Sequence, residues 1–409
     1  MTRRVARTRV LAVSAVAFVV ALGAFLALNG TAQPTRGRPA NADALTQRGN
    51  RELQRARETA DPAHYARAEA AFGQALRRDR RSVDATIGMA TLALARHDFR
   101  GGLRYARRAR RLGPELARPF SVLVDAQVEL GRYEQTGRSL QQMIDLQPNL
   151  ASYARVSYFR ELHGDLAGAT RAMRLAVSAG GGAPENVAYV QTLLGDLEAT
   201  RGRTRAARRA YAAALAGVAG YVPALASRAQ LDAATGRLEP AIGAYEDIVR
   251  RRPLPQYVIA LGEAQQAAGR RADARETFAL VDAERRLLAA TGVNTDVEIA
   301  LFEADHGDRR RALDLARRAW RAAPSVRSAD AVSWALTRSG RSSDGLVWAR
   351  RALKLGSRDP LILTRAGLSA QAAGHDREAR RYLHRALQAN PRFSVVWAPR
   401  AREALRSLR

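Results

Sequence analysis

The apolar residues of this chain follow a helical spacing that repeats along most of its length. One unit runs from Gly374 to Pro391, in which a turn glycine is followed by an amphipathic stretch and then a proline. Small or apolar residues stand five, nine and twelve positions after the glycine, at Ala379, Leu383 and Ala386. The same order recurs upstream at a period near 34 residues. Self-similarity at this period predicts stacked helix pairs rather than one globular core.

The turns inside the expected pairs are marked by a glycine or a histidine. They are 33 or 34 residues apart, except for two spacings of 38, the second of which predicts a longer second helix that ends near Thr291. With an irregular pair before the first turn, the pattern predicts nine or ten helix pairs. We expect each turn glycine to adopt a left-handed backbone at the helix end. The turns are centred on His97, Gly131, Gly164, Gly202, Gly236, Gly269, Gly307, Gly340 and Gly374.

Small side chains predict how the two helices of a pair meet. The residues five positions after each turn and seven positions before it are mostly alanine, glycine, serine or threonine. These two sites are expected to face each other, because a bulky residue at either would push the helices apart. Glycine inside a helix costs about 1 kcal/mol relative to alanine. Gly195, Gly262 and Gly367 therefore predict close helix approach.

This pattern resembles the tetratricopeptide repeat family over roughly residues 42–391. The clearest matches are Leu194-Gly195 for a first helix, with Ala207-Tyr211-Ala214 and Ala241-Tyr245-Ile248-Pro253 for second helices. The resemblance implies an all-α fold, a right-handed α-solenoid of about nine to ten helix pairs whose first helices line a concave groove. Members of the family mostly bind peptides or protein segments there, which implies a protein partner. Residues 392–409 are expected to form a capping helix.

The resemblance also places particular residues in that groove. The partner-binding candidates are Asp125, Tyr158, Asp196, Gln230, Glu263 and Trp334. Tyr158 and Trp334 are the aromatic anchors that a bound peptide would use. Packing between neighbouring repeats is the alternative role for these two side chains.

The N-terminal 41 residues differ from the repeats. Residues 1–9 form a basic flank, and residues 10–28 contain no charge, so a helix of roughly 28 Å there predicts a transmembrane anchor. The flank favours a cytoplasmic N-terminus, with the repeats on the extracytoplasmic side of the cell membrane. A cleaved signal peptide, which would leave a secreted protein, is the alternative. Residues 29–41, which contain glycine and proline, predict a linker.

The charge of the chain suggests a second kind of partner. The net charge is +28, Lys354 is the one lysine, and arginines cluster on the expected second helices, as in Arg203–Arg209 and Arg377–Arg385. We expect a basic outer surface, so the alternative function is electrostatic binding of an anionic polymer, a lipid surface or nucleic acid. Nucleic acid is disfavoured, because the repeats are expected outside the cytoplasm. The basic runs also lack interleaved aromatic residues for base stacking.

Residues that carry enzymatic chemistry are sparse. The sequence has no cysteine, which excludes disulfides, thiolate metal sites and cysteine nucleophiles. Four of its six histidines, His97, His163, His306 and His375, lie at or beside turns, where we expect them to be solvated. No sequence motif of a metalloprotease, a phosphate loop or a dinucleotide site is present. The sequence thus predicts a non-enzymatic, membrane-tethered scaffold without cofactor or metal.

Overall fold

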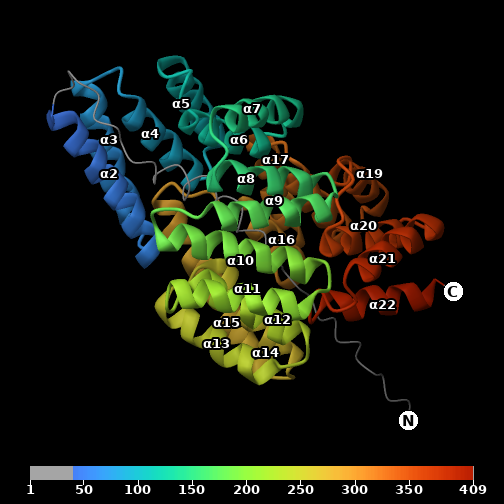
Figure 1. Ribbon diagram of the computed structural model, residues 1–409. Helices are drawn as coiled ribbons and strands as arrows, with labels where there is room; N and C mark the ends of the chain where they lie inside the picture. Colours follow the sequence, from blue (N-terminus) through green and yellow to red (C-terminus); the bar gives the residue numbers. More distant parts are fainter. Residues whose placement is uncertain (1–39, 409) are drawn as a thin grey trace, which may run out of the picture.

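The computed structural model describes residues 40–408, and these form 21 helices arranged as ten pairs and a final helix (Figure 1). The first helices of the pairs are α2 (Ala40–Thr59), α4 (Val83–Ala95), α6 (Arg118–Glu129), α8 (Leu150–Leu162), α10 (Pro184–Thr200), α12 (Val222–Ala234), α14 (Pro255–Ala267), α16 (Asp296–His306), α18 (Val326–Arg338) and α20 (Pro360–Ala372). The second helices are α3 (Ala63–Arg78), α5 (Phe99–Leu112), α7 (Tyr133–Leu146), α9 (Leu166–Ala179), α11 (Thr204–Gly217), α13 (Leu238–Arg251), α15 (Arg271–Ala290), α17 (Arg309–Ala322), α19 (Ser342–Ala352) and α21 (Asp376–Ala389). The all-α arrangement in pairs agrees with the prediction.

The turns within the pairs confirm most of the expected backbone. Seven of the eight predicted turn glycines have a positive φ, and His97 adopts the same left-handed conformation with a φ of 61°. Gly307 is the exception, with a φ of −129°. There the Glu303 carboxylate accepts a hydrogen bond from the Asp308 N–H at 2.9 Å, which helps to end the helix in another way. The predicted long second helix is α15, which ends at Ala290.

The small residues beside each turn do bring the two helices of a pair together. The Ser157 hydroxyl donates to the Ala169 carbonyl at 2.8 Å, and the Ser333 hydroxyl donates to that of Gly345 at 2.9 Å. At Gly195 a Cβ would lie 2.2 Å from the Tyr211 ring. The predicted close approach is therefore confirmed, and at Gly195 it makes room for an aromatic ring of the second helix.

The array winds back onto itself, so that helices far apart in sequence touch. In Figure 1 the helices α16 and α17 lie behind the middle of the array, where α6 to α10 are drawn. The Val326 N–H donates to the Tyr133 hydroxyl at 2.8 Å across 193 residues, and the Asn390 amide donates to the Ala199 carbonyl at 2.7 Å across 191. Turns of early pairs thus rest against loops that follow much later pairs.

We call this contact line the seam. It joins Arg96 to Asn294, Arg100 to Ala322, Tyr133 to Val326, Gly164 to Gly356, and Ala199 to Asn390. The Asn294 N–H donates to the Arg96 carbonyl at 3.0 Å, directly after the extended helix α15. Most of these contacts use backbone carbonyls as acceptors. The seam holds successive turns of the superhelix together and encloses the side that the first helices face.

The structure describes the C-terminal end of the chain but not the predicted transmembrane segment near its N-terminus. Helix α22 (Trp397–Ser407) packs on α20 and α21 and buries Trp397 completely. The predicted transmembrane segment 10–28, with its basic flank and most of the linker, lies outside the described residues. Among residues 40–408, none of the helices has both the length and the apolar character needed to cross a bilayer.

Candidate functional site

The enclosed side of the array contains the six residues that the sequence placed in a binding groove. Each lies on a first helix: Asp125 on α6, Tyr158 on α8, Asp196 on α10, Gln230 on α12, Glu263 on α14 and Trp334 on α18. We refer to this side as the interior. The structure brings Asp125 and Tyr158 to one small cavity and leaves the other four along the following helices.

Asp125 forms a two-point ion pair with Arg155, one first helix further on. The Arg155 guanidinium donates from Nε to Oδ1 at 2.9 Å and from Nη2 to Oδ2 at 2.7 Å. Arg155 is 1% exposed and also donates to the carbonyls of Ser121 and Ala151. Burial raises the pKa of Asp125, although the ion pair with Arg155 opposes this rise. Both side chains therefore have their hydrogen-bonding capacity largely satisfied within the fold.

The cavity beside this ion pair is lined by Asp125, Arg155, Tyr158 and Glu129, and its volume is about 10 Å³. That volume suffices for about one water molecule and not for a peptide side chain. Burial raises the pKa of Tyr158 well above its usual value, and burial also raises the pKa of Glu129. From α18, beside the seam, the Arg327 guanidinium comes within 3.6 Å of Glu129 and 3.5 Å of Glu298 on α16.

Asp196 and Glu263 are also engaged inside the fold. The Tyr211 hydroxyl donates to Asp196 Oδ1 at 2.8 Å, and burial raises the pKa of Asp196 to about 6. Glu263 is buried, with its Oε1 3.9 Å from Nε2 of His306. Gln230 is half-buried. Asp196 and Glu263 therefore offer little free polar surface.

His306 corrects the expectation of solvated turn histidines. Its side chain is 7% exposed and packs on the rings of Phe278 and Phe302, with centroids 4.3 Å and 5.3 Å away. Burial lowers the pKa of His306 to about 3, so its imidazole is neutral at ordinary pH. Burial likewise lowers the pKa of His97, whose turn lies at the seam. His163 and His375 are exposed, as expected.

Trp334, the second predicted anchor, is a packed interior residue here. It is 3% exposed and meets Trp397 of α22 edge to face at 5.3 Å. Its indole Nε1 donates to Asp305 Oδ1 at 2.8 Å. Burial raises the pKa of Asp305 to about 7. Both the ring and the polar atom of Trp334 thus already have partners within the chain.

Further ion pairs join first helices in the interior, and the sequence reasoning did not predict this pairing. Arg365 on α20 is 1% exposed and pairs with Asp330 on α18, and Arg118 on α6 pairs with Asp84 on α4. These pairs and Asp125–Arg155 span 35, 34 and 30 residues. An acidic and a basic residue about one repeat apart on first helices were therefore a usable signal in the sequence.

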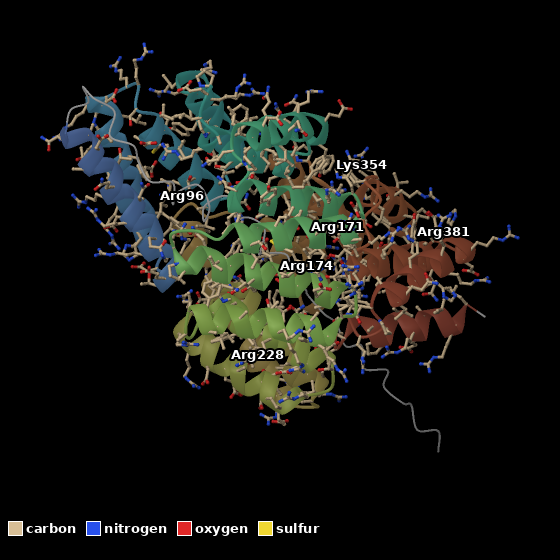
Figure 2. The ribbon with its side chains drawn as sticks, in the orientation of Figure 1. Arg96, Arg171, Arg174, Arg228, Lys354 and Arg381 are labelled. Carbon is tan, nitrogen blue, oxygen red and sulfur yellow. The ribbon has the colours of Figure 1, made fainter. Side chains whose placement is uncertain are left out.

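The outer side of the array is basic, as predicted, and is formed mainly by the second helices. Figure 2 shows arginine side chains over the surface, among them Arg171 and Arg174 on α9. Several of these outer arginines pair with carboxylates of a neighbouring helix, as Arg208 does with Asp232 at 2.7 Å and Arg350 with Glu378 at 2.6 Å. Part of the positive charge is thus neutralised locally. In residues 40–408 no three metal-ligating side chains are grouped to hold a metal ion.

Comparisons with known proteins add little to this geometry. No protein-family model matches the sequence, and no curated protein matches it. Solved structures that align over much of the chain include the following three. The human IFIT1 dimer with PPP-AAAA is 15% identical, with 85% of this chain and 84% of that chain covered and a TM-score of 0.47. The APC/C hetero-tetramer Cut9–Hcn1 is also 15% identical, with 93% and 79% covered and a TM-score of 0.40. A tetratricopeptide repeat protein from Parabacteroides merdae is 16% identical, with 63% and 98% covered and a TM-score of 0.36. Such values support no inference about binding or activity.

Proposed function

We propose that this chain is a non-enzymatic helix-repeat scaffold that binds a protein partner. The observation that carries the proposal is the continuous stack of ten helix pairs, closed along the seam into one body with a large outer surface. Stacked repeats of this kind offer extended surfaces on which a partner can lie. Electrostatic binding of an anionic polymer, lipid surface or nucleic acid is the competing function, and the exposed outer arginines support it.

The partner could bind either in the interior or on the outer surface of the array. Binding in the interior by Asp125, Tyr158, Asp196, Gln230, Glu263 and Trp334 stays a prediction. In the closed array it would require the seam to open, because these side chains are packed or paired and the cavity beside Asp125 is small. Binding on the outer surface requires no such rearrangement.

Partner capture with the full chain tests the function. The bait is exposed to lysate and envelope fractions and washed first at low and then at moderate salt. A discrete protein that survives the second wash, and that captures the chain in the reverse experiment, supports the scaffold. Recovery of polymer, lipid or nucleic acid alone, all stripped by salt, contradicts it and favours the electrostatic function.

A matched pair of variants then locates the partner. Gln230 is half-buried in the interior, and Gln141 is exposed on the second helix α7. Loss of the partner with Gln230→Arg but not with Gln141→Arg, at unchanged melting temperature, supports interior binding. Retention of the partner by Gln230→Arg indicates that the partner binds on the outer surface.

We also propose that residues 10–28 tether the scaffold to the cell membrane, with the repeats on the extracytoplasmic side. The uncharged stretch and its basic flank support this proposal. Extraction of membranes at alkaline pH and protease treatment of intact cells test it. A tethered chain stays in the pellet and its repeats are cleaved from outside. Release of a shortened chain into the medium would support signal cleavage instead.

A further inference from the structure

A hollow on the outer surface combines apolar and basic side chains near the C-terminal end of the array. It lies among α17, α18 and α19 and has a volume of about 310 Å³, which is at the lower limit of typical ligand pockets. Trp320 of α17 and Trp348 of α19 form its aromatic wall, with the two rings edge to face at 4.8 Å. These two tryptophans lie on adjacent second helices, beside Arg317-Arg318 and Arg350-Arg351. They contradict the expectation that the basic runs lack interleaved aromatic residues.

Val347, on the rim of this hollow, breaks the charge pattern of the outer surface. It lies seven residues after the turn at Gly340 and is 58% exposed. The position seven residues after the turn holds an exposed arginine in five other pairs: Arg104, Arg138, Arg171, Arg209 and Arg381. In the other three pairs it holds Gly243, Glu276 or Asp314, so Val347 is the one large apolar residue at this position. Figure 2 labels two of these five, Arg171 and Arg381. An exposed apolar residue that borders a hollow indicates a docking contact.

The charge around the hollow favours an anionic occupant. Arg317 and Arg321 are exposed, and neither forms an ion pair with a carboxylate in the described part of the chain. Arg341 also lines the hollow but is paired with Asp344, at 2.9 Å and 2.6 Å from Oδ2. Two arginines without a carboxylate partner therefore line the hollow, together with the paired Arg341 and Asp344 and the apolar residues Val332, Leu336 and Val347.

The aromatic wall favours an aliphatic side chain over a nucleic-acid base. The Arg351 guanidinium lies over Trp348 at 4.6 Å and over Trp320 at 5.2 Å. This guanidinium and the edge-to-face contact between the two rings cover ring faces on which a base would stack. The Val347 methyl groups and the parts of the two rings that these contacts leave uncovered suit a branched apolar side chain.

We propose that this hollow, the Trp320–Trp348 site, docks an acidic segment of a protein partner. An aliphatic side chain of the segment packs against Val347 and the tryptophan edges, while flanking carboxylates pair with Arg317 and Arg321. Arginine forms two-point hydrogen bonds with carboxylates, which fixes the orientation of the segment. The proposal rests on the scaffold function above and names the chemistry of its partner.

The test uses the full chain and the fluorescent peptide acetyl-Glu-Glu-Leu-Leu-Glu-Glu-amide, followed by anisotropy. Two further peptides replace the leucines by serine or the glutamates by glutamine. Val347→Arg restores the residue of the equivalent position in other pairs, and Arg317→Glu reverses one charge of the site. Arg171→Glu is the matched control, because it makes the same charge change as Arg317→Glu at an exposed arginine of a distant pair, in the position equivalent to Val347.

We expect saturable binding of the first peptide, and a loss of about tenfold or more with Val347→Arg, with Arg317→Glu and with each altered peptide. Arg171→Glu is expected to change affinity by less than about twofold. Melting temperatures of the variants confirm that they are folded. No binding of the peptide, equal binding by Val347→Arg, or an equal loss with Arg171→Glu overturns the proposal. So does stronger displacement by oligodeoxythymidylate or by phosphatidylglycerol vesicles.

Failure here is distinguishable from failure of the scaffold function. If Val347→Arg captures the same protein as the unaltered chain, the Trp320–Trp348 site is not the docking site and the scaffold function stands. If the unaltered chain captures no protein at all, the scaffold function itself is wrong.

Discussion

Turns with the same sequence motif have two different environments in this array. Gly131 and Gly164 lie on the seam, where a Cβ would come within 2.2 Å of the Pro324 carbonyl oxygen and 2.3 Å of the Gly356 carbonyl oxygen. Four other turn glycines have a similar positive φ but nothing within 4 Å of that position: Gly236, Gly269, Gly340 and Gly374. At those turns glycine provides only the backbone conformation, whereas on the seam it also allows two backbones to meet. The repeat motif therefore encodes each helix pair, and the seam is an additional property of the whole array.

The largest expected effect comes from the same substitution made in both environments. Gly236→Ala should destabilise the protein by about 1–2 kcal/mol, which is the cost of a left-handed backbone for alanine. Gly131→Ala carries that cost and must also displace Pro324, which adds about 1–3 kcal/mol. Urea unfolding measures the difference in free energy, and hydrogen exchange at Val326 shows whether the seam has loosened. Equal losses in the two variants would mean that the seam contributes nothing to stability.

A smaller effect is expected from the hydroxyl of Tyr133. Tyr133→Phe leaves the buried Val326 N–H without its acceptor, at a cost of about 1–3 kcal/mol. Tyr245→Phe is the control, because the Tyr245 hydroxyl donates at 3.1 Å to the Ala226 carbonyl on the neighbouring first helix, away from the seam. Amide exchange at Val326 should accelerate in the first variant alone. If both variants accelerate it, the seam is not an independent unit.

The smallest expected effect is a pH dependence that also reports on the seam. Burial raises the pKa of Glu161 to about 8, and Asp359 in the loop after α19 adds to the rise. Since the folded pKa lies above the usual 4.5, stability from Glu161 is complete below that value and is lost as pH rises towards 8. The lowered pKa values of His306 and His97 reduce stability only below their usual pKa of 6.5. The raised pKa of Asp305, about 7, makes stability fall as pH rises, as that of Glu161 does.

We therefore expect the melting temperature to fall between about pH 6.5 and 8.5. Glu161→Gln should remove most of the upper part of that fall, since a neutral amide cannot ionise next to Asp359. Calorimetric scans across this window measure both chains. An unchanged slope in the variant would show that Glu161 is not protonated in the folded protein.

The pairs could be predicted from the sequence because their causes are local. Small residues and turn glycines act between helices that follow one another, as the Ser157–Ala169 contact illustrates. The seam could not be predicted, since its acceptors include the backbone carbonyls of Arg96 and Ala199, which any residue supplies. The length of α15 was a visible irregularity, but nothing in the sequence showed that the loop after it would reach Arg96.

For the candidate site, the sequence predicted which helices carry the residues but not how they are used. Asp125 and Trp334 were expected to face a partner because they are polar or aromatic on a face assigned to a groove. The neighbouring first helices instead gave them Arg155 and Asp305 as partners, 30 and 29 residues away in the sequence. Predicting these partners required the register in which adjacent pairs stack. The hollow at Trp320 depends in the same way on the stacking of two adjacent second helices.

The long sequence separation across the seam sets an order for folding. Helix pairs form from contacts within about one repeat, whereas Tyr133 and Val326 are 193 residues apart, and bringing such distant segments together costs more chain entropy. We expect the stack to assemble first and the coil to close last, which pulse-labelled hydrogen exchange would detect as late protection of the Val326 amide. Until that moment the first helices of a newly made chain are open to solvent. A segment bound there early in synthesis would be enclosed by closure and released only at the rate at which the coil reopens.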